Sequence, residues 1–273
     1  MVNFESPRAL KVRKQITQAL SDFKMLEEGD RVMVCCSGGK DSSILLALLS
    51  EIRRRAPFNF DLEAVMLDQK QPGFNPRDFS EWVASLGLKL TIIERDTYSI
   101  VKEKVTTGTY CSLCSRLRRA ILYDHAVDHG FTKLALGHHR DDANQTLLLN
   151  LFYSGKISSM PPKLKSDDAR NILVRPLHYV AEADLIELSQ EWKMPIIPCN
   201  LCGSQEGMKR QMLKKWLQEM EQKIPGLHAS LLTAQGDVHE SQLSDLRLWD
   251  FANLKSDLKL ADPSDPDQSH INF

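Results

Sequence analysis

Apolar and polar positions alternate along the chain in two patterns, one typical of buried strands and one typical of helices. Short continuous apolar runs indicate strands at 31–36, 62–67, 88–94, 133–137 and 171–177. Apolar residues at helical spacing predict the helices, at 7–27, 42–55, 76–86, 113–129, 142–153, 181–192 and 208–223. This order predicts an α/β fold: a Rossmann-like parallel sheet of about five strands with helices on both faces, and helical additions at the N- and C-terminal ends.

Three polar segments that contain glycine each follow a predicted strand. They are SGGKDS at 37–42, DQKQPGF at 68–74 and GHHRDD at 137–142. Ligands of open parallel sheets bind beyond the carboxyl ends of the strands. We therefore expect the three segments to meet at one edge of the sheet and to form the functional site there.

The composition is that of a folded protein with a distinct acidic end. Of the 273 residues, 42% are hydrophobic, which is enough for a packed core. The net charge is -1, but residues 237–273 contain eight acidic and three basic residues, so the rest of the chain is mildly basic. That balance is compatible with an RNA partner without requiring one. We expect one domain at 1–236 and a partly disordered acidic tail at 237–273.

Neither a membrane span nor a secretion signal is visible in the sequence. The N-terminal stretch MVNFESPRALKVRKQ lacks the apolar core of a signal peptide, and the apolar run Ile44–Leu49 is far shorter than a span of about 20 residues. The sequence therefore predicts a soluble, cytoplasmic protein that does not enter a membrane.

The segment that follows the first strand has the composition of a phosphate cradle. Its two glycines allow a sharp turn and a close approach to a ligand, and the helix that begins there presents unpaired N–H groups. The hydroxyls and the lysine add donors and a positive charge, while Asp41 is suited to the magnesium ion of a nucleotide. The residues expected to bind the nucleotide are Ser37, Gly38, Gly39, Lys40, Asp41 and Ser42. The segment is neither a Walker A loop nor G-x-G-x-x-G, and an ordinary glycine turn would not need all six residues.

The six cysteines fall into three pairs, at 35/36, 111/114 and 199/202. The adjacent pair lies in a predicted strand and is interpreted as two small buried side chains. The other two pairs are C-x-x-C motifs, which in a cytosolic enzyme indicate metal or redox chemistry rather than structural disulfides. From the residues alone an iron–sulfur cluster, a four-cysteine zinc site and a redox-active disulfide at Cys111/Cys114 all stay open.

Several motifs together resemble one enzyme family. The S-G-G-x-D-S segment resembles the pyrophosphate loop of the N-type ATP pyrophosphatases, the PP-loop superfamily. The segments at 67–74, 111–123, 137–164 and 195–205 resemble the TtcA family of tRNA-cytidine 2-sulfurtransferases, nearly residue for residue. The resemblance covers roughly residues 10–235, and the acidic tail lies outside it.

This resemblance implies an ATP-dependent tRNA sulfurtransferase. Such an enzyme adenylates the C2 oxygen of cytidine 32 in the anticodon loop and replaces that oxygen with sulfur, giving 2-thiocytidine, AMP and pyrophosphate. It implies a [4Fe-4S] cluster held by Cys111, Cys114 and Cys202, whose open iron would deliver the sulfur. Cys199 lies three residues from Cys202 and is not excluded as the third ligand. The implied partners are tRNA and a cysteine desulfurase as sulfur donor; a homodimer is possible.

Other residues at the predicted sheet edge are candidates for the nucleotide site. Asp68, Gly137, His138 and Asp141 are expected to contact ATP or its Mg²⁺, while His139 is expected to be structural. Lys40 and Asp41 are the expected catalytic residues of the loop. A carboxylate beside the fourth strand would equally serve as a helix cap.

Two basic stretches are candidates for contact with RNA phosphates. They are Arg116, Arg118 and Arg119 in one stretch and Lys156, Lys163, Lys165 and Arg170 in the other. The alternative function is a PP-loop ligase for a small molecule, or a uridine thiolase, with a structural zinc at the two C-x-x-C pairs.

Overall fold

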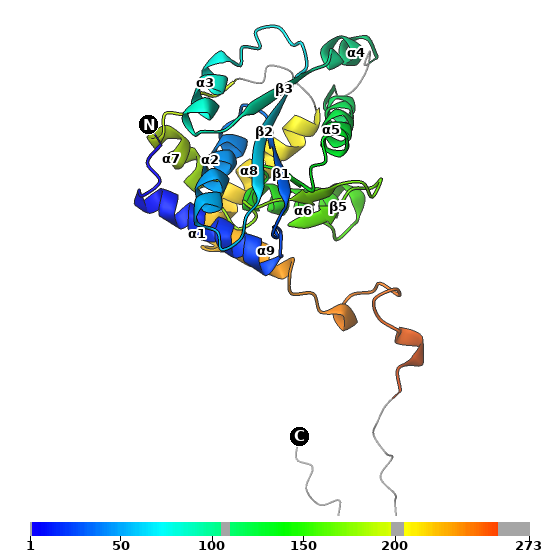
Figure 1. Cartoon of the computed structure of the whole chain (residues 1–273). Coiled ribbons are helices and arrows are strands. Elements are labelled where there is room, and N and C mark those ends of the chain that lie inside the picture. The colour runs from blue at the N-terminus through cyan, green and yellow to red at the C-terminus, as the bar shows by residue number, and fades with distance from the viewer. Residues whose placement is uncertain (1, 105–109, 198–204, 256–273) are drawn as a thin grey trace, which may run out of the picture. The chain divides into compact units, whose positions relative to one another are not determined.

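The computed structural model of the chain describes residues 2–104, 110–197 and 205–255. By its internal contacts the chain divides into two compact units, Met1–Leu232 and Thr233–Phe273. The boundary suggested by the sequence, after residue 236, stays a prediction. In the first unit a central sheet lies between helices (Figure 1). No helix in the described part of the chain is long and apolar enough to span a membrane.

The sheet has six strands in the order β3-β2-β1-β4-β6-β5. They are β1 Arg31–Cys36, β2 Asp61–Asp68, β3 Leu90–Glu94, β4 Lys133–Ala135, β5 Lys163–Lys165 and β6 Ile172–Val174. All neighbours pair in parallel except β5, which is antiparallel to β6. The predicted parallel α/β sheet is thus confirmed, with one added edge strand that sequence periodicity did not predict.

The seven predicted helices are all present in the predicted order, together with further helices and 3-10 turns. They are α1 Pro7–Asp22, α2 Lys40–Arg55, α3 Arg77–Ser85, α4 Thr97–Lys104, α5 Tyr110–Asp128, α6 Arg140–Ser154, α7 Glu182–Glu191, α8 Gln205–Lys223, α9 Leu227–Ala234, η1 Glu240–Gln242 and η2 Phe251–Asn253. α4, α9 and the two 3-10 turns were not predicted. α5 begins at residue 110 rather than 113, so Cys111 and Cys114 both belong to its first turns.

Side chains of β1 alternate between two hydrophobic clusters. Val32, Val34 and Cys36 belong to the larger cluster, which also contains buried residues of α1, α2 and α7. Met33 belongs to the smaller cluster, and Cys35 packs against that cluster from a half-buried position, on the face that α5 covers. The period of two along a strand places successive side chains on opposite faces, so one strand holds both layers together.

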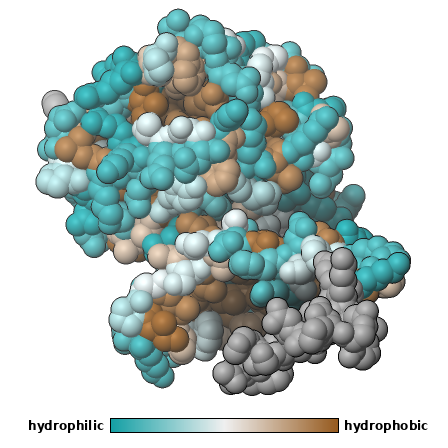
Figure 2. All heavy atoms as spheres, turned by 90° about the horizontal axis from the view of Figure 1, so that it is seen from below, coloured by the Kyte–Doolittle hydropathy of each residue, from teal (hydrophilic) through white to brown (hydrophobic). Residues whose placement is uncertain are grey.

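The edge strand β5 is more exposed than the central strand β1. β5 has the sequence KLK, and Lys163 is half-buried while Lys165 is exposed. On the face seen in Figure 2 the surface is mostly hydrophilic, with apolar side chains exposed in patches between polar ones. The central strand β1 is instead almost fully buried, which gives the loop that follows it a rigid base.

Candidate active site

The glycine-rich loop lies at the switch point of the sheet, where the strand order reverses between β1 and β4. β1 pairs with β2 on one side and with β4 on the other, both in parallel. A crevice forms at such a switch point beyond the carboxyl ends of the strands. The loop 37–39 follows β1 and the segment 137–139 follows β4, so the expected convergence of these segments is a consequence of the observed topology.

The two serines of the loop bind each other and the main chain. The Ser42 hydroxyl accepts a hydrogen bond from Ser37 N at 3.2 Å and lies 3.3 Å from the Ser37 hydroxyl. Gly39 N donates to Ser37 Oγ at 3.3 Å, and Ser43 Oγ donates to Gly39 O at 2.8 Å. Gly39 caps α2 without a side chain of its own. The first turn of α2 therefore offers main-chain N–H groups to an anion, as expected for a phosphate cradle.

Glycine is required at two positions around the loop. Gly38 has φ +76°, and a Cβ there would lie 2.7 Å from the Cβ of Ile197. Ile197 N also donates to Gly38 O at 2.9 Å, which ties the segment before residue 198 to the loop. At Gly137 a Cβ would lie 2.8 Å from Ser42 N, so the chain leaving β4 passes directly against the start of α2.

Lys40 is held by two carboxylates. Its Nζ lies 2.9 Å from Asp41 Oδ1 and 3.5 Å from Glu182 Oε1, at the start of α7. Burial disfavours the charged amine, but Asp41 and Glu182 outweigh it and raise the pKa of Lys40 above its usual value. Lys40 is therefore a cation at neutral pH. Glu182 was not among the residues expected from the sequence, where it only lies at the start of the helix predicted at 181–192.

The segment after β4 supplies both helix caps and buried carboxylates. Asp142 Oδ2 accepts from His139 N at 3.1 Å, which caps α6 and agrees with the structural role expected for His139. Asp141 is buried; it accepts from Glu182 N at 2.9 Å and lies 3.3 Å from His228 Nδ1. Asp141 thus joins α6 to α7 and α9. Whether it also contacts a nucleotide stays a prediction.

His138 is a neutral residue at this edge. Burial is the main cause that lowers the pKa of His138 to about 4, because the imidazolium would lose its hydration. Its Nδ1 is buried and has no hydrogen-bond partner among the described residues. A buried polar atom without a partner needs an explanation, and contact of His138 with a nucleotide stays a prediction.

Asp68 and Gln69 extend the edge towards α5. Asp68 Oδ1 accepts from Lys70 N at 2.7 Å and thereby shapes the turn after β2. Gln69 Oε1 accepts from Thr97 Oγ1 and from the Cys114 thiol, both at 3.1 Å. Cys114 of α5 therefore lies at the same edge of the sheet as the loop, beside the segment that follows the neighbouring strand β2. Sequence reasoning had selected Asp68 and had passed over Gln69.

The cysteine pairs differ in their surroundings. Burial raises the pKa of Cys35 to about 12 and raises that of Cys36 as well, so both thiols stay protonated. Cys36 is buried as interpreted from the sequence, whereas Cys35 is half-buried. Cys111 and Cys114 lie three residues apart near the N-terminus of α5, the end of a helix that stabilises thiolates. Cys199 and Cys202 lie outside the described residues.

The basic residues predicted to contact RNA differ in whether their charge is already paired. Arg116, Arg118 and Arg119 are exposed on α5 close to Cys114. Arg170 is paired at 2.8 Å with both Asp124 and Asp168, so its charge is already compensated. The exposed arginines of α5 are therefore better placed than Arg170 to meet a phosphate.

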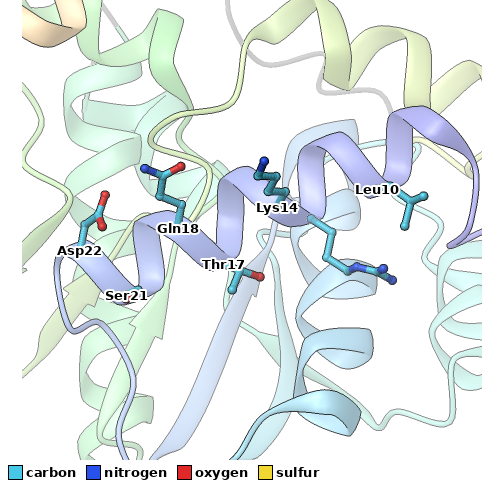
Figure 3. A pocket seen from close by; sticks show the side chains of 7 residues that line it. Leu10, Lys14, Thr17, Gln18, Ser21 and Asp22 are labelled. Atoms are coloured by element: carbon cyan, nitrogen blue, oxygen red, sulfur yellow. The ribbon is translucent and has the colours of Figure 1, made fainter.

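A separate surface hollow of about 440 Å³ lies along α1 and contains none of the motif residues. Its lining comes from one stripe of that helix: Leu10, Arg13, Lys14, Thr17, Gln18, Ser21 and Asp22 (Figure 3). Because one helix supplies every described lining residue, the hollow has no set of converging groups. The residues at the carboxyl ends of β1 and β4 remain the candidate active site.

The loop and sheet have counterparts among known proteins. The family described as the PP-loop domain matches residues 9–197. The U34-tRNA thiolase NcsA from Methanococcus maripaludis, solved with its [4Fe-4S] cluster, has a TM-score of 0.69 at 21% identity, covering 84% of this chain and 78% of that one. That likeness concerns the fold. Fold and loop together define a PP-loop protein.

Relatives of higher sequence identity show which family of PP-loop proteins the chain belongs to. The tRNA-cytidine(32) 2-sulfurtransferase of Bdellovibrio bacteriovorus is 64% identical over 255 residues, covering 93% of this chain and 98% of that protein. The enzyme of the same name from Aeromonas hydrophila is 52% identical over 256 residues, covering 93% and 85%. The chain belongs to the family of tRNA-cytidine(32) 2-sulfurtransferases, and it is a transferase.

Proposed function

We propose that the chain thiolates C2 of cytidine 32 in the tRNA anticodon loop, with ATP as the activating substrate. The observation that carries the proposal is that the loop 37–42 and Cys114 lie at one edge of the sheet, connected through β1, β2 and Gln69. Two chemical tasks then meet in one crevice. The loop handles the triphosphate, and the cysteines handle sulfur.

The loop supports the first task. The triphosphate would take the main-chain N–H groups at the start of α2, the hydroxyls of Ser37 and Ser42, and the cation of Lys40. Asp41, now paired with Lys40, would turn to Mg²⁺ once the phosphates take the lysine. Asp68, Gly137, His138 and Asp141 stay candidates for the remaining contacts of the nucleotide.

The reaction has two bond exchanges. The cytosine O2 attacks the α-phosphorus, the bond to the bridging oxygen breaks, and pyrophosphate leaves. A hydrosulfide sulfur then adds to C2, the C2–O bond breaks, and AMP leaves with the oxygen while one proton goes to solvent. The positive start of α2 and Lys40 stabilise the negative charge that accumulates on the phosphates in the first exchange.

The cysteines are the proposed ligands of an iron–sulfur centre. Cys111 and Cys114 share a helix N-terminus, and the Cys114 side chain is half-buried beside the polar amide of Gln69. Cys202 is the proposed third ligand, with Cys199 as the competing residue. A [4Fe-4S] cluster with three protein ligands supplies an iron site that is open to exogenous sulfur. The chain's own part is to orient the thiolates and to keep the centre close to the base.

The substrate must reach the crevice as an unpaired nucleotide. Bases in RNA loops are splayed out of the stack before a protein reads or modifies them. The exposed arginines at 116, 118 and 119 would bind the phosphates on either side of the target. A cysteine desulfurase is the proposed source of sulfur, and a homodimer is the proposed assembly.

Analysis of tRNA nucleosides tests the function. Cells that lack the gene should lose 2-thiocytidine by mass spectrometry, while 2-thiouridine stays at its normal level. Purified protein with ATP, Mg²⁺, sulfide and the unmodified tRNA should restore the product under anaerobic conditions. Loss of a thiouridine with intact 2-thiocytidine would contradict the proposal, and so would one zinc ion per chain in place of iron.

A further inference from the structure

A lysine outside the PP-loop match contacts the phosphate site through a carboxylate. Lys214 in α8 lies 2.7 Å from Glu182 Oε1, and the same oxygen lies 3.5 Å from Lys40 Nζ. The family match ends at residue 197, so Lys214 comes from the part of the chain that follows it. The carboxylate of Glu182 thus stands between the lysine of the loop and a lysine of α8.

These groups form a row of alternating charge. The row runs from Lys214 to Glu182, to Lys40 and to Asp41, with only 16% of the Glu182 side chain exposed to solvent. Although burial opposes its ionisation, the two lysines lower the pKa of Glu182, so it is a carboxylate at neutral pH. A fixed negative charge beside a triphosphate site repels the ligand unless another cation neutralises it.

We propose that Lys214 belongs to the electrostatics of the triphosphate site: it neutralises Glu182, so that this carboxylate positions Lys40 without repelling the phosphates of ATP. The inference rests on the proposed use of ATP. Lys214 and Glu182 act through Lys40 and are positioning residues. The main-chain N–H of Glu182 donates to Asp141 Oδ2 at 2.9 Å, which fixes the start of α7 beside the segment that follows β4.

The proposal makes an unusual prediction about a double variant. In Lys214→Met the carboxylate of Glu182 loses its partner and competes with the phosphates for Lys40, so the Kd for MgATP should rise roughly tenfold. In Glu182→Gln/Lys214→Met the amide oxygen still accepts from Lys40 but the charge is gone. The Kd should then return to within about threefold of the unchanged protein, because the two substitutions are coupled.

The neighbouring lysine provides a matched control. Lys215 is 81% exposed and lies 3.9 Å from Glu219, so Lys215→Met makes the same change of net charge on the same helix away from Glu182. Isothermal titration with MgATP measures the Kd of the three variants and of the unchanged protein, and thermal melting checks that each one is folded. The control should bind MgATP as the unchanged protein does.

The outcomes separate the two proposals. If the unchanged protein binds no MgATP, the proposed use of ATP fails, and this inference fails with it. If the unchanged protein binds but Lys214→Met matches Lys215→Met, only the role of Lys214 is overturned. A double variant that binds as weakly as Lys214→Met would overturn it too, since a merely structural contact predicts no rescue.

Discussion

The two faces of the sheet differ in how firmly they are packed. On the face covered by α1, α2 and α7, thirty of the described residues form one buried cluster. On the face covered by α5 the corresponding cluster has five buried members within the described ranges: Met33, Val65, Ala126, Leu134 and Leu173. The loop for the proposed phosphates begins a helix of the first face, whereas Cys114 lies on the helix of the second face.

The difference in packing matches the different tasks proposed for α2 and α5. A phosphate cradle must hold main-chain groups in place, and α2 is held by a run of buried residues from Ser42 to Ile52. The helix with the cysteines is anchored by half-buried side chains such as Leu122 and Tyr123. Local stability tracks the number of buried apolar contacts, so α5 should open more readily than α2.

The largest effect on activity is expected from a substitution in α5, the helix that contains Cys111 and Cys114. Cys114→Ser should abolish 2-thiocytidine formation and lower the bound iron of anaerobically purified protein to below about a tenth, because a hydroxyl is a poor ligand for the cluster. The Kd for MgATP should stay the same, since the loop belongs to the other face. Iron analysis, visible absorption and titration calorimetry measure these quantities.

Cys35→Ala is the control for that variant, because Cys35 is a protonated thiol that packs against the smaller cluster on the same face. It should keep its iron. Full iron content in Cys114→Ser would rule out Cys114 as a ligand.

The next effect concerns the loop. Gly38→Ala combines a positive φ with a Cβ 2.7 Å from Ile197, so the loop must shift and the Kd for MgATP should rise on the order of 100-fold. Gly155→Ala has a similar φ, +59°, but its Cβ meets nothing within 4 Å. It should cost about 1 kcal/mol of unfolding free energy and leave MgATP binding unchanged. Equal binding defects in both variants would show that backbone strain alone disturbs the site.

A pair of core substitutions measures the two faces directly. Leu46→Ala in α2 removes a fully buried side chain and should lower the unfolding free energy by about 3 kcal/mol. Leu122→Ala in α5 removes a half-buried side chain and should cost about half as much. Urea denaturation gives both values. A larger loss at Leu122 than at Leu46 would reverse the proposed order of the two faces.

The smallest effect is the response to acid. Burial lowers the pKa of His138 and of His178 to about 4, well below the usual value of about 6.5. Between these two values the unfolded chain binds protons that the folded chain does not, so stability falls as the pH drops from 6.5 to 4 and is constant above that range. His178→Phe should remove part of this loss, because the ring lies beside Phe23 and needs no charge. Denaturation at pH 7 and pH 5 checks this, and an unchanged slope in the variant would contradict it.

The sequence predicted the fold because its strongest signals are local. The run RVMVCC and the residues that follow it predict a buried strand, a turn and a helix start without knowledge of the partners. β5 was missed because KLK is too short to show a period, and its pairing depends on β6. α5 was predicted too short at its start because the cysteine segment has no apolar period.

Contacts of the site between distant residues were outside the reach of the sequence. Glu182 and Lys40 are 142 residues apart in the sequence and come into contact only in the folded sheet. Gln69 and Cys114 are 45 residues apart and contact each other in the same way. Glu182 stands in no motif with a recognised chemical role, and the amide of Gln69 was not selected within its segment 68–74. Gln69 did carry one signal, since it follows a predicted buried strand at the edge where ligands bind.

The lysines of the edge strand β5 affect whether the protein associates with other chains at high concentration. An open strand exposes unpaired N–H and C=O groups, to which a second chain can add and start a fibril. β5 is only three residues long, and its lysines Lys163 and Lys165 flank the single leucine. Approach of another such strand would bring like charges together. The two lysines therefore disfavour growth of the sheet at this end, even when α5 opens on the second face.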